Sequence, residues 1–100
     1  MDKNTALEYA KQYAENVKKT CSPDSIFVYG SYVNGTNDEN SDIDIAVIFN
    51  GFKGDFLETS SILYQLTCEV STVIEPILLD STNDKSGFVN EIIRTGQRVA

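Results

Sequence analysis

One short segment constrains the fold of this chain more than any other feature. In it, two aspartates lead into an apolar run. Residues 43–49 read Ile-Asp-Ile-Ala-Val-Ile-Phe and are rich in the β-branched and aromatic residues typical of strands. Side chains alternate between the two faces of a strand, so the odd-numbered residues from Ile43 to Phe49 share one face and can form a core. Asp42 and Asp44 then share the opposite face. The chain is therefore expected to build a sheet around this strand.

Five further segments have the patterns of regular secondary structure. Apolar residues at helical spacing predict helices over residues 5–19, 55–69 and 86–95. Runs rich in β-forming residues predict strands over 25–29 and 72–79. This order of elements predicts an α/β (α+β) fold with a small mixed sheet of about three strands and with helices packed on one face.

Local signals refine the ends of these elements. Thr5 and Glu8 form the Thr-x-x-Glu pattern of a capping box, so we expect the first helix to begin at Thr5. Pro76 cannot donate a hydrogen bond within a sheet, so we expect the strand that contains it to lie at an edge or to carry a bulge. Gly96 is expected to end the last helix.

The length of the chain and its apolar runs bound its organisation. One hundred residues suit a single domain that spans 1–100. No apolar run approaches the ~20 residues of a transmembrane helix, and the N-terminus lacks the apolar core of a signal peptide. We therefore expect a cytoplasmic protein without membrane contact.

The overall charge and the missing residue types exclude several classes of function. A formal net charge of −7 argues against direct binding of nucleic acid, which needs clustered lysine and arginine. The same acidity fits a metal site or a basic protein partner, although it also simply keeps a small protein in solution. The absence of histidine excludes Ser-His-Asp and Cys-His catalysis and most zinc sites.

Asp42 and Asp44 carry the clearest chemical signal. Two like charges on one face of a strand repel each other and raise each other's pKa unless a cation lies between them. Carboxylate oxygens are the ligands that Mg²⁺ and Mn²⁺ prefer, so a divalent metal is the natural remedy. The alternative is a solvated Asp-x-Asp at the open end of a strand, since exposed acidic residues are the rule.

A third carboxylate would complete a site for two metal ions, which clamps the attacking and leaving oxygens of an in-line displacement. Glu75 is the best candidate because it lies between the apolar residues Ile74 and Pro76, where a charge needs a partner. Glu69 is the competitor, but it lies near a helix end and is expected to be solvated.

Gly30 and Ser31 directly follow the predicted strand 25–29. Glycine lets the backbone approach a phosphate closely, and Ser31 adds a hydroxyl and an amide donor. If a helical turn starts here, its free N–H groups form an anion site. Taken alone the pair says little, because Gly-Ser also marks many ordinary turns.

Together these residues resemble a known signature. Gly30-Ser31, ten further residues and then Asp42-x-Asp44 are similar to the motif of the DNA polymerase β-like nucleotidyltransferase superfamily. A predicted strand precedes the Gly-Ser pair, an apolar strand follows Asp44, and Glu75 lies in the next strand. The short chain resembles the minimal nucleotidyltransferase subgroup (MNT), and the resemblance covers nearly all of it.

The resemblance implies an activity and a set of roles. Members bind ATP or another nucleoside triphosphate with Mg²⁺. Asp42, Asp44 and Glu75 would hold two Mg²⁺ ions, and Glu75 would also help to deprotonate an acceptor hydroxyl. Gly30 and Ser31 would hold the terminal phosphates. Many minimal members are antitoxins of a HEPN-domain ribonuclease toxin, and some transfer AMP to a tyrosine of that toxin.

One departure from the family leaves part of the site open. Many relatives carry a basic residue just after Gly-Ser, whereas this chain has Tyr32-Val33-Asn34. The charge of the triphosphate must then be met by metal, by backbone amides, or by a lysine such as Lys53 or Lys85.

Two other functions are consistent with the same residues. The domain could neutralise a partner toxin by masking its surface, with little or no catalysis. It could also transfer a nucleotide to a small molecule, with the acceptor site supplied by another subunit.

Overall fold

The apolar run at residues 43–49 forms an inner strand of a four-stranded sheet. The strands are β1 (Ser25–Tyr29), β2 (Ile43–Phe49), β3 (Ile74–Asp80) and β4 (Gln97–Arg98), in the order β3-β2-β1-β4. This arrangement comes from a computed structural model that describes all residues from 1 to 100. β1 is antiparallel to β2 and to β4, whereas β3 is parallel to β2. The sheet is therefore mixed, as the sequence predicted.

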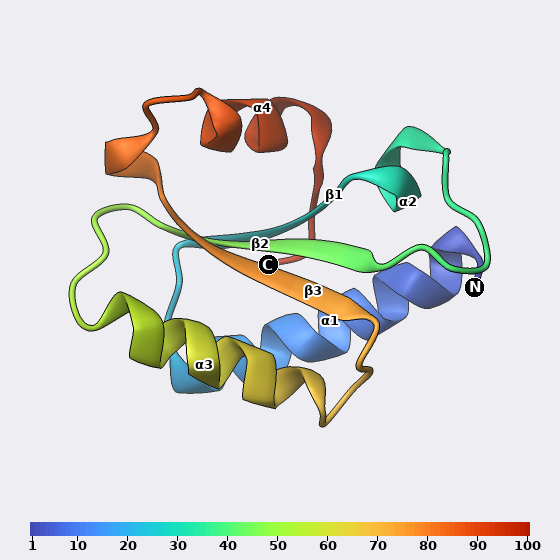
Figure 1. Cartoon of the computed structure of the whole chain (residues 1–100), viewed down its shortest axis with the longest axis horizontal. Coiled ribbons are helices and arrows are strands. Elements are labelled where there is room, and N and C mark those ends of the chain that lie inside the picture. Colours follow the sequence, from blue (N-terminus) through green and yellow to red (C-terminus); the bar gives the residue numbers. More distant parts are fainter.

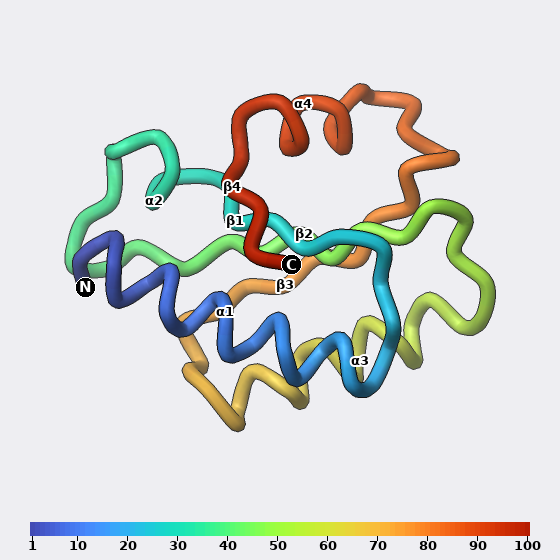
Figure 2. The backbone as a smooth tube through the Cα atoms, turned by 180° about the vertical axis from the view of Figure 1, so that it is seen from behind, coloured from blue at the N-terminus to red at the C-terminus, as the bar shows by residue number.

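Helices cover both faces of this sheet (Figure 1). α1 (Lys3–Thr20) and α3 (Phe56–Thr67) lie against one face, and α4 (Phe88–Thr95) lies against the other. Figure 2 shows the same layers from behind. The short helices α2 (Ser31–Asn34) and η1 (Ser81–Asn83) follow β1 and β3. None of these helices combines the length and the apolar character that a membrane crossing requires.

The two faces of the sheet have separate cores. The larger core packs the odd-numbered residues of β2 against α1 and α3. The smaller core lies under α4 and consists of Phe27, Ala46, Ile48, Val89 and Ile92. The expectation of helices on one face was wrong, because Ala46 and Ile48 make β2 apolar on its second face beyond Asp44. A strand that is apolar on both faces must be covered on both.

The strand count also differs from the expected three. β4 contains only the exposed residues Gln97 and Arg98, which pair with Val28 and Phe27. Two polar residues have no detectable alternation, so no sequence pattern could identify this strand. The predicted class, a mixed α+β fold, is confirmed.

The helix ends follow local side-chain chemistry. α1 begins at Lys3 because the carboxylate of Asp2 accepts a hydrogen bond of 2.8 Å from the N–H of Thr5. The predicted start at Thr5 was therefore wrong, since an aspartate caps the helix earlier. Asp55 caps α3 in the same way, through a 3.0 Å bond from the N–H of Glu58. Gly96 ends α4, as expected.

Pro76 lies in an edge strand, where a residue without a backbone N–H is tolerated. β3 is an edge strand, so a residue without an N–H interrupts no inner ladder. Pro76 pairs with Ile45 in a register that runs without a break from Ile74 to Asp80. The edge alternative is thus confirmed, and there is no bulge. The unbroken register matters for function because it fixes which residues of β2 and β3 stand side by side.

Replacement of Tyr13 by phenylalanine should weaken the contact between α1 and α3. The fully buried Tyr13 donates a 2.7 Å hydrogen bond from its hydroxyl to the carbonyl oxygen of Leu63. Tyr13→Phe should lower the free energy of unfolding by about 1 kcal/mol, as for a typical buried hydrogen bond. Tyr9→Phe is the matched control, since Tyr9 is partly buried against the same core. Equal losses for both variants in urea denaturation would contradict this role.

Candidate active site

Three neighbouring strands bring Tyr29, Asp44 and Glu75 into one row. Asp44 of β2 pairs with Tyr29 of β1 on one side and with Glu75 of β3 on the other. The three residues share the face of the sheet that α4 covers further along, since Tyr29 packs against the smaller core. Asp42 lies two residues before Asp44, just ahead of β2. The register therefore places the three predicted carboxylates at one end of the sheet.

The charges of this row are unbalanced. Desolvation raises the pKa of Asp44 above its ordinary value, and the negative charges of Asp42 and Glu75 raise it further. The one salt bridge in the structure joins Arg94 to Glu91 on α4, so no basic side chain forms an ion pair with these carboxylates. A bound cation would balance these negative charges.

The carboxylates of Asp42, Asp44 and Glu75 are of the kind that binds divalent cations, and their backbone positions bring them to one end of the sheet. Carboxylates are suitable ligands for Mg²⁺, and strand pairing fixes Asp44 beside Glu75. No three acidic or thiol side chains converge closely enough to enclose an ion in the conformation of this structure. Like charges with nothing between them favour such divergence, so their side chains would have to turn inward to bind a metal.

The Gly30 turn lies directly against Asp44. Gly30 ends β1 and precedes α2 with φ +81° and ψ −147°, a backbone region nearly confined to glycine. A Cβ atom at Gly30 would overlap Oδ2 of Asp44. Glycine is therefore required here both by the backbone conformation and by the approach of a carboxylate. The same turn orients Ser31 as the first residue of α2.

A buried tyrosine connects this turn to the aspartates. Tyr32 of α2 is only 1% exposed, and its hydroxyl lies 3.5 Å from the carbonyl oxygen of Ser41, which it can reach as a donor. The hydroxyl oxygen of Ser41 in turn accepts a 2.9 Å bond from the N–H of Asp38. These contacts hold the loop before Asp42 against α2, so the Gly-Ser turn and the Asp-x-Asp segment lie together.

A cavity of about 250 Å³ adjoins the Gly30 turn between α2 and α4. Its lining residues are Tyr29, Gly30, Val33, Asn34, Phe88, Glu91, Ile92 and Thr95. None of them is basic. Of the residues that follow Gly-Ser, the neutral Asn34 lines this cavity, while Tyr32 is directed into the core.

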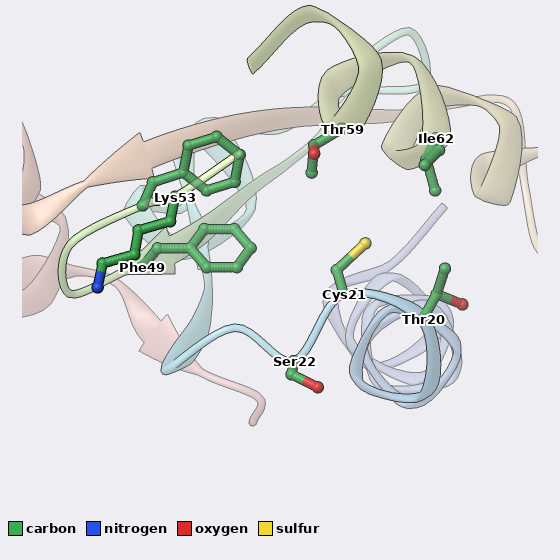
Figure 3. A pocket seen from close by; sticks show the side chains of 8 residues that line it. Thr20, Cys21, Ser22, Phe49, Lys53, Thr59 and Ile62 are labelled. Atoms are coloured by element: carbon green, nitrogen blue, oxygen red, sulfur yellow. The ribbon is translucent and has the colours of Figure 1, made fainter. Parts of the chain in front are cut away.

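Neither of the two lysines that the sequence suggested for the triphosphate lines the cavity beside Gly30. Lys53 lines a different cavity of about 340 Å³ with Cys21 and Phe49 (Figure 3). Phe49 is five residues along β2 from Asp44, a distance of about 16 Å. Lys85 lies between η1 and the start of α4 and does not line the cavity beside Gly30. The expectation for Lys53 was therefore wrong, because it follows the far end of the strand that begins at the aspartates. The role suggested for Lys85 stays a prediction.

The reason given for Glu75 also needs correction. Glu75 is exposed, since β3 lies at the edge of the sheet, so burial does not require it to have a partner. Its pairing with Asp44 is the stronger argument. The competitor Glu69 is exposed in the turn after α3 and pairs with no strand.

Two tyrosines near the carboxylates were not singled out from the sequence. Tyr29 pairs with Asp44, and the hydroxyl of Tyr64 on α3 lies 3.4 Å from Oε2 of Glu75. Burial and the nearby carboxylates raise the pKa of Tyr29. The sequence could have indicated Tyr29, because it ends the predicted strand directly before Gly30. No sequence pattern indicated Tyr64, since its helical spacing assigns it to an apolar face.

A methyl group at Gly30 should disturb the site more than a methyl group at Gly35. Both glycines have positive φ, but a Cβ at Gly35 meets no atom within 4 Å. We expect Gly35→Ala to cost about 1 kcal/mol of unfolding free energy from backbone strain alone. Gly30→Ala should cost about 3 kcal/mol, because it adds a steric overlap with Asp44. Equal losses in urea denaturation would show that Gly30 and Asp44 are not in contact.

Neutralising Asp44 should stabilise the domain when no divalent cation is present. A carboxyl whose pKa is raised on folding stabilises the fold only while protonated, so its contribution is lost as pH rises from the ordinary value of 3.8 through the native pKa. In EDTA at pH 7, Asp44→Asn should therefore melt at a higher temperature than the parent protein. The difference should shrink below pH 4.

Glu69→Gln removes the same charge from an exposed turn and should leave the melting temperature nearly unchanged. A lower melting temperature for Asp44→Asn at pH 7 would contradict the unbalanced charge of the site.

The fold is similar to that of solved structures. Two solved structures have the same fold: a provisionally assigned nucleotidyltransferase from Sulfolobus solfataricus and a toxin-antitoxin with AMP-PNP. The first has a TM-score of 0.69 and 20% identity over 96% of this chain and 80% of its own. The second has a TM-score of 0.60 and 22% identity over 90% of this chain and 72% of its own.

At this identity the two structures establish the likeness of fold alone. No curated protein gives a significant match. The sequence model of the family described as polymerase beta, nucleotidyltransferase matches residues 10–100. Since that match spans nearly the whole chain, the protein belongs to the polymerase beta nucleotidyltransferase family.

Proposed function

We propose that this protein transfers AMP from ATP to a hydroxyl acceptor with the help of Mg²⁺. The observation that carries the proposal is the contact of the Gly30 turn with Asp44, between Asp42 and Glu75. It combines a close backbone approach for phosphate with a carboxylate cluster that has no basic partner. The family supports transfer of a nucleotide as the reaction class.

Each residue of the cluster has a role in this proposal. Asp42, Asp44 and Glu75 would hold Mg²⁺, which, when bound, neutralises the phosphates and the charge that develops during transfer. Gly30 and Ser31 bind the terminal phosphates through backbone amides and the serine hydroxyl. An acceptor hydroxyl attacks the α-phosphorus while Glu75 accepts its proton, and pyrophosphate leaves. Catalysis here is mainly positioning and electrostatic stabilisation.

We further propose an antitoxin of the minimal nucleotidyltransferase type, whose acceptor is a tyrosine of a HEPN-domain toxin. A toxin-antitoxin with AMP-PNP is among the structures with this fold. The net charge of −7 suits a basic partner. Such a partner would also supply cations that the cavity beside Gly30 lacks.

A binding role without catalysis is the second candidate. Phe56 and Leu57 on α3 are 52% and 79% exposed, which is unusual for large apolar side chains and suits contact with a partner. In that case the domain would neutralise a toxin by covering its surface. The carboxylate variants described next separate the two functions.

Asp44→Asn, Asp42→Asn and Glu75→Gln should each lower AMP transfer at least about 100-fold, because each removes a metal ligand. The assay mixes the protein, ATP and Mg²⁺ with a purified HEPN toxin and follows the mass of the toxin. Glu69→Gln is the matched control for Glu75→Gln and should retain full activity, since Glu69 pairs with no strand. Omission of Mg²⁺ should abolish transfer by the parent protein.

Undiminished transfer by both aspartate variants would rule out the metal site. If the toxin stays unmodified yet Asp44→Asn still suppresses its toxicity in cells, the masking function is correct instead.

A further inference from the structure

A tyrosine of this chain contacts the carboxylate that is the proposed proton acceptor. The hydroxyl of Tyr64 donates toward Oε2 of Glu75 at 3.4 Å, from α3 across the edge of β3. Glu75 is the proposed acceptor of the proton, so this contact has the donor and acceptor arrangement of general-base catalysis. The distance is long, as such contacts often are in the absence of substrate.

The position of Tyr64 permits the approach of a nucleotide. Its side chain is 51% exposed, and it lines a groove of about 180 Å³ between α3 and β3. The groove is open along the edge of the sheet, because β3 has no neighbour beyond it. Glu75 stands next to Asp44 in the register, so the Tyr64 hydroxyl lies at the border of the proposed nucleotide site.

The other four tyrosines do not combine these properties. Tyr13 and Tyr32 are buried, and their hydroxyls are directed to backbone carbonyl groups. Tyr29 lies beside Asp44, but it is half-buried with Phe88 packed edge-on against its ring at 5.6 Å. Tyr9 lies on α1 without a hydrogen bond to a carboxylate. Tyr64 is thus the one tyrosine with an exposed ring and a hydroxyl on a carboxylate of the site.

We propose that Tyr64 is itself an acceptor and that the domain attaches AMP to its own Tyr64. The inference rests on the proposed function, since it uses the same donor site. A bond forms between the Tyr64 hydroxyl oxygen and the α-phosphorus of ATP. The bond from that phosphorus to the oxygen bridging to the β-phosphorus breaks, and pyrophosphate leaves with the electron pair. The phenolic proton passes to Oε2 of Glu75.

The product would alter the surface around the site. An AMP group on Tyr64 adds a negative charge at the rim of the groove and stands in front of Glu75. It also lies next to Phe56, which lines the same groove and belongs to the exposed apolar part of α3. Self-modification would therefore slow the entry of an external acceptor and change the face offered to a partner.

The test uses the intact chain with ATP and Mg²⁺ and measures three quantities. Intact mass and peptide mapping report AMP on Tyr64. Pyrophosphate release and AMP transfer to free tyrosinamide report the reaction at the donor site. Calorimetry with the α,β-methylene analogue of ATP, which cannot release pyrophosphate, reports nucleotide binding. Tyr64→Phe removes only an exposed hydroxyl, so it should fold, and Tyr9→Phe is the matched control.

The inference predicts one AMP per chain at Tyr64 in the parent protein and in Tyr9→Phe, and none in Tyr64→Phe. Tyr64→Phe should bind the analogue within about twofold of the parent and still modify tyrosinamide. Pyrophosphate release or modified tyrosinamide without AMP on Tyr64 would overturn the inference and leave the proposed function intact. Absence of analogue binding, of pyrophosphate and of any adduct would overturn both.

Discussion

The proximity of the Gly30 turn and the Asp44 carboxylate is the constraint on which the rest of the site depends. Gly30 adopts a conformation that side chains resist, and Asp44 lies where its Cβ would be. Strand pairing on both sides of Asp44 fixes the positions of Tyr29 and Glu75. One steric contact and two strand registers thus hold the Gly30 turn and the three carboxylates at one end of the sheet.

The remainder of the fold keeps this arrangement rigid. β2 is fully buried after Asp44, with a core on each of its faces, so the strand cannot shift its register without exposing one of them. The charged residues lie at the open end of the strand, where water and ligands have access. Desolvation of the Asp44 carboxylate, and then repulsion from its acidic neighbours, oppose its ionised form there. Such local cost is common at sites built to bind a ligand.

Much of the fold could be predicted because its signals are local. β2 has a continuous apolar pattern, Asp55 caps its own helix, and Pro76 is tolerated only at an edge. The errors concern information that is not local. Alternation places Asp42 and Asp44 on one face, but it does not show that α4 covers that face further along. Two polar residues gave no sign of β4.

In the candidate site, too, some features could be predicted from the sequence and others are visible only in the folded protein. The spacing of Gly30-Ser31 and Asp42-x-Asp44 is a property of the sequence, and family likeness gives it meaning. The sequence argument for Glu75 assumes that it is buried, but its side chain is exposed. It belongs to the candidate site because it pairs with Asp44, and only the folded sheet reveals that pairing. Tyr64 could not be found at all, because its contact joins a helix to a strand eleven residues away across the sheet edge.

The central claim is that a divalent cation binds between Asp42, Asp44 and Glu75 beside the Gly30 turn. Titration of the isotopically labelled protein with Mn²⁺ and a non-hydrolysable ATP analogue tests it most directly, since the paramagnetic ion broadens only the amide resonances near it. We expect the signals of Gly30, Ser31, Asp42, Asp44 and Glu75 to broaden first. Broadening centred instead on the acidic residues of the far end, Asp80 and Asp84, would contradict it.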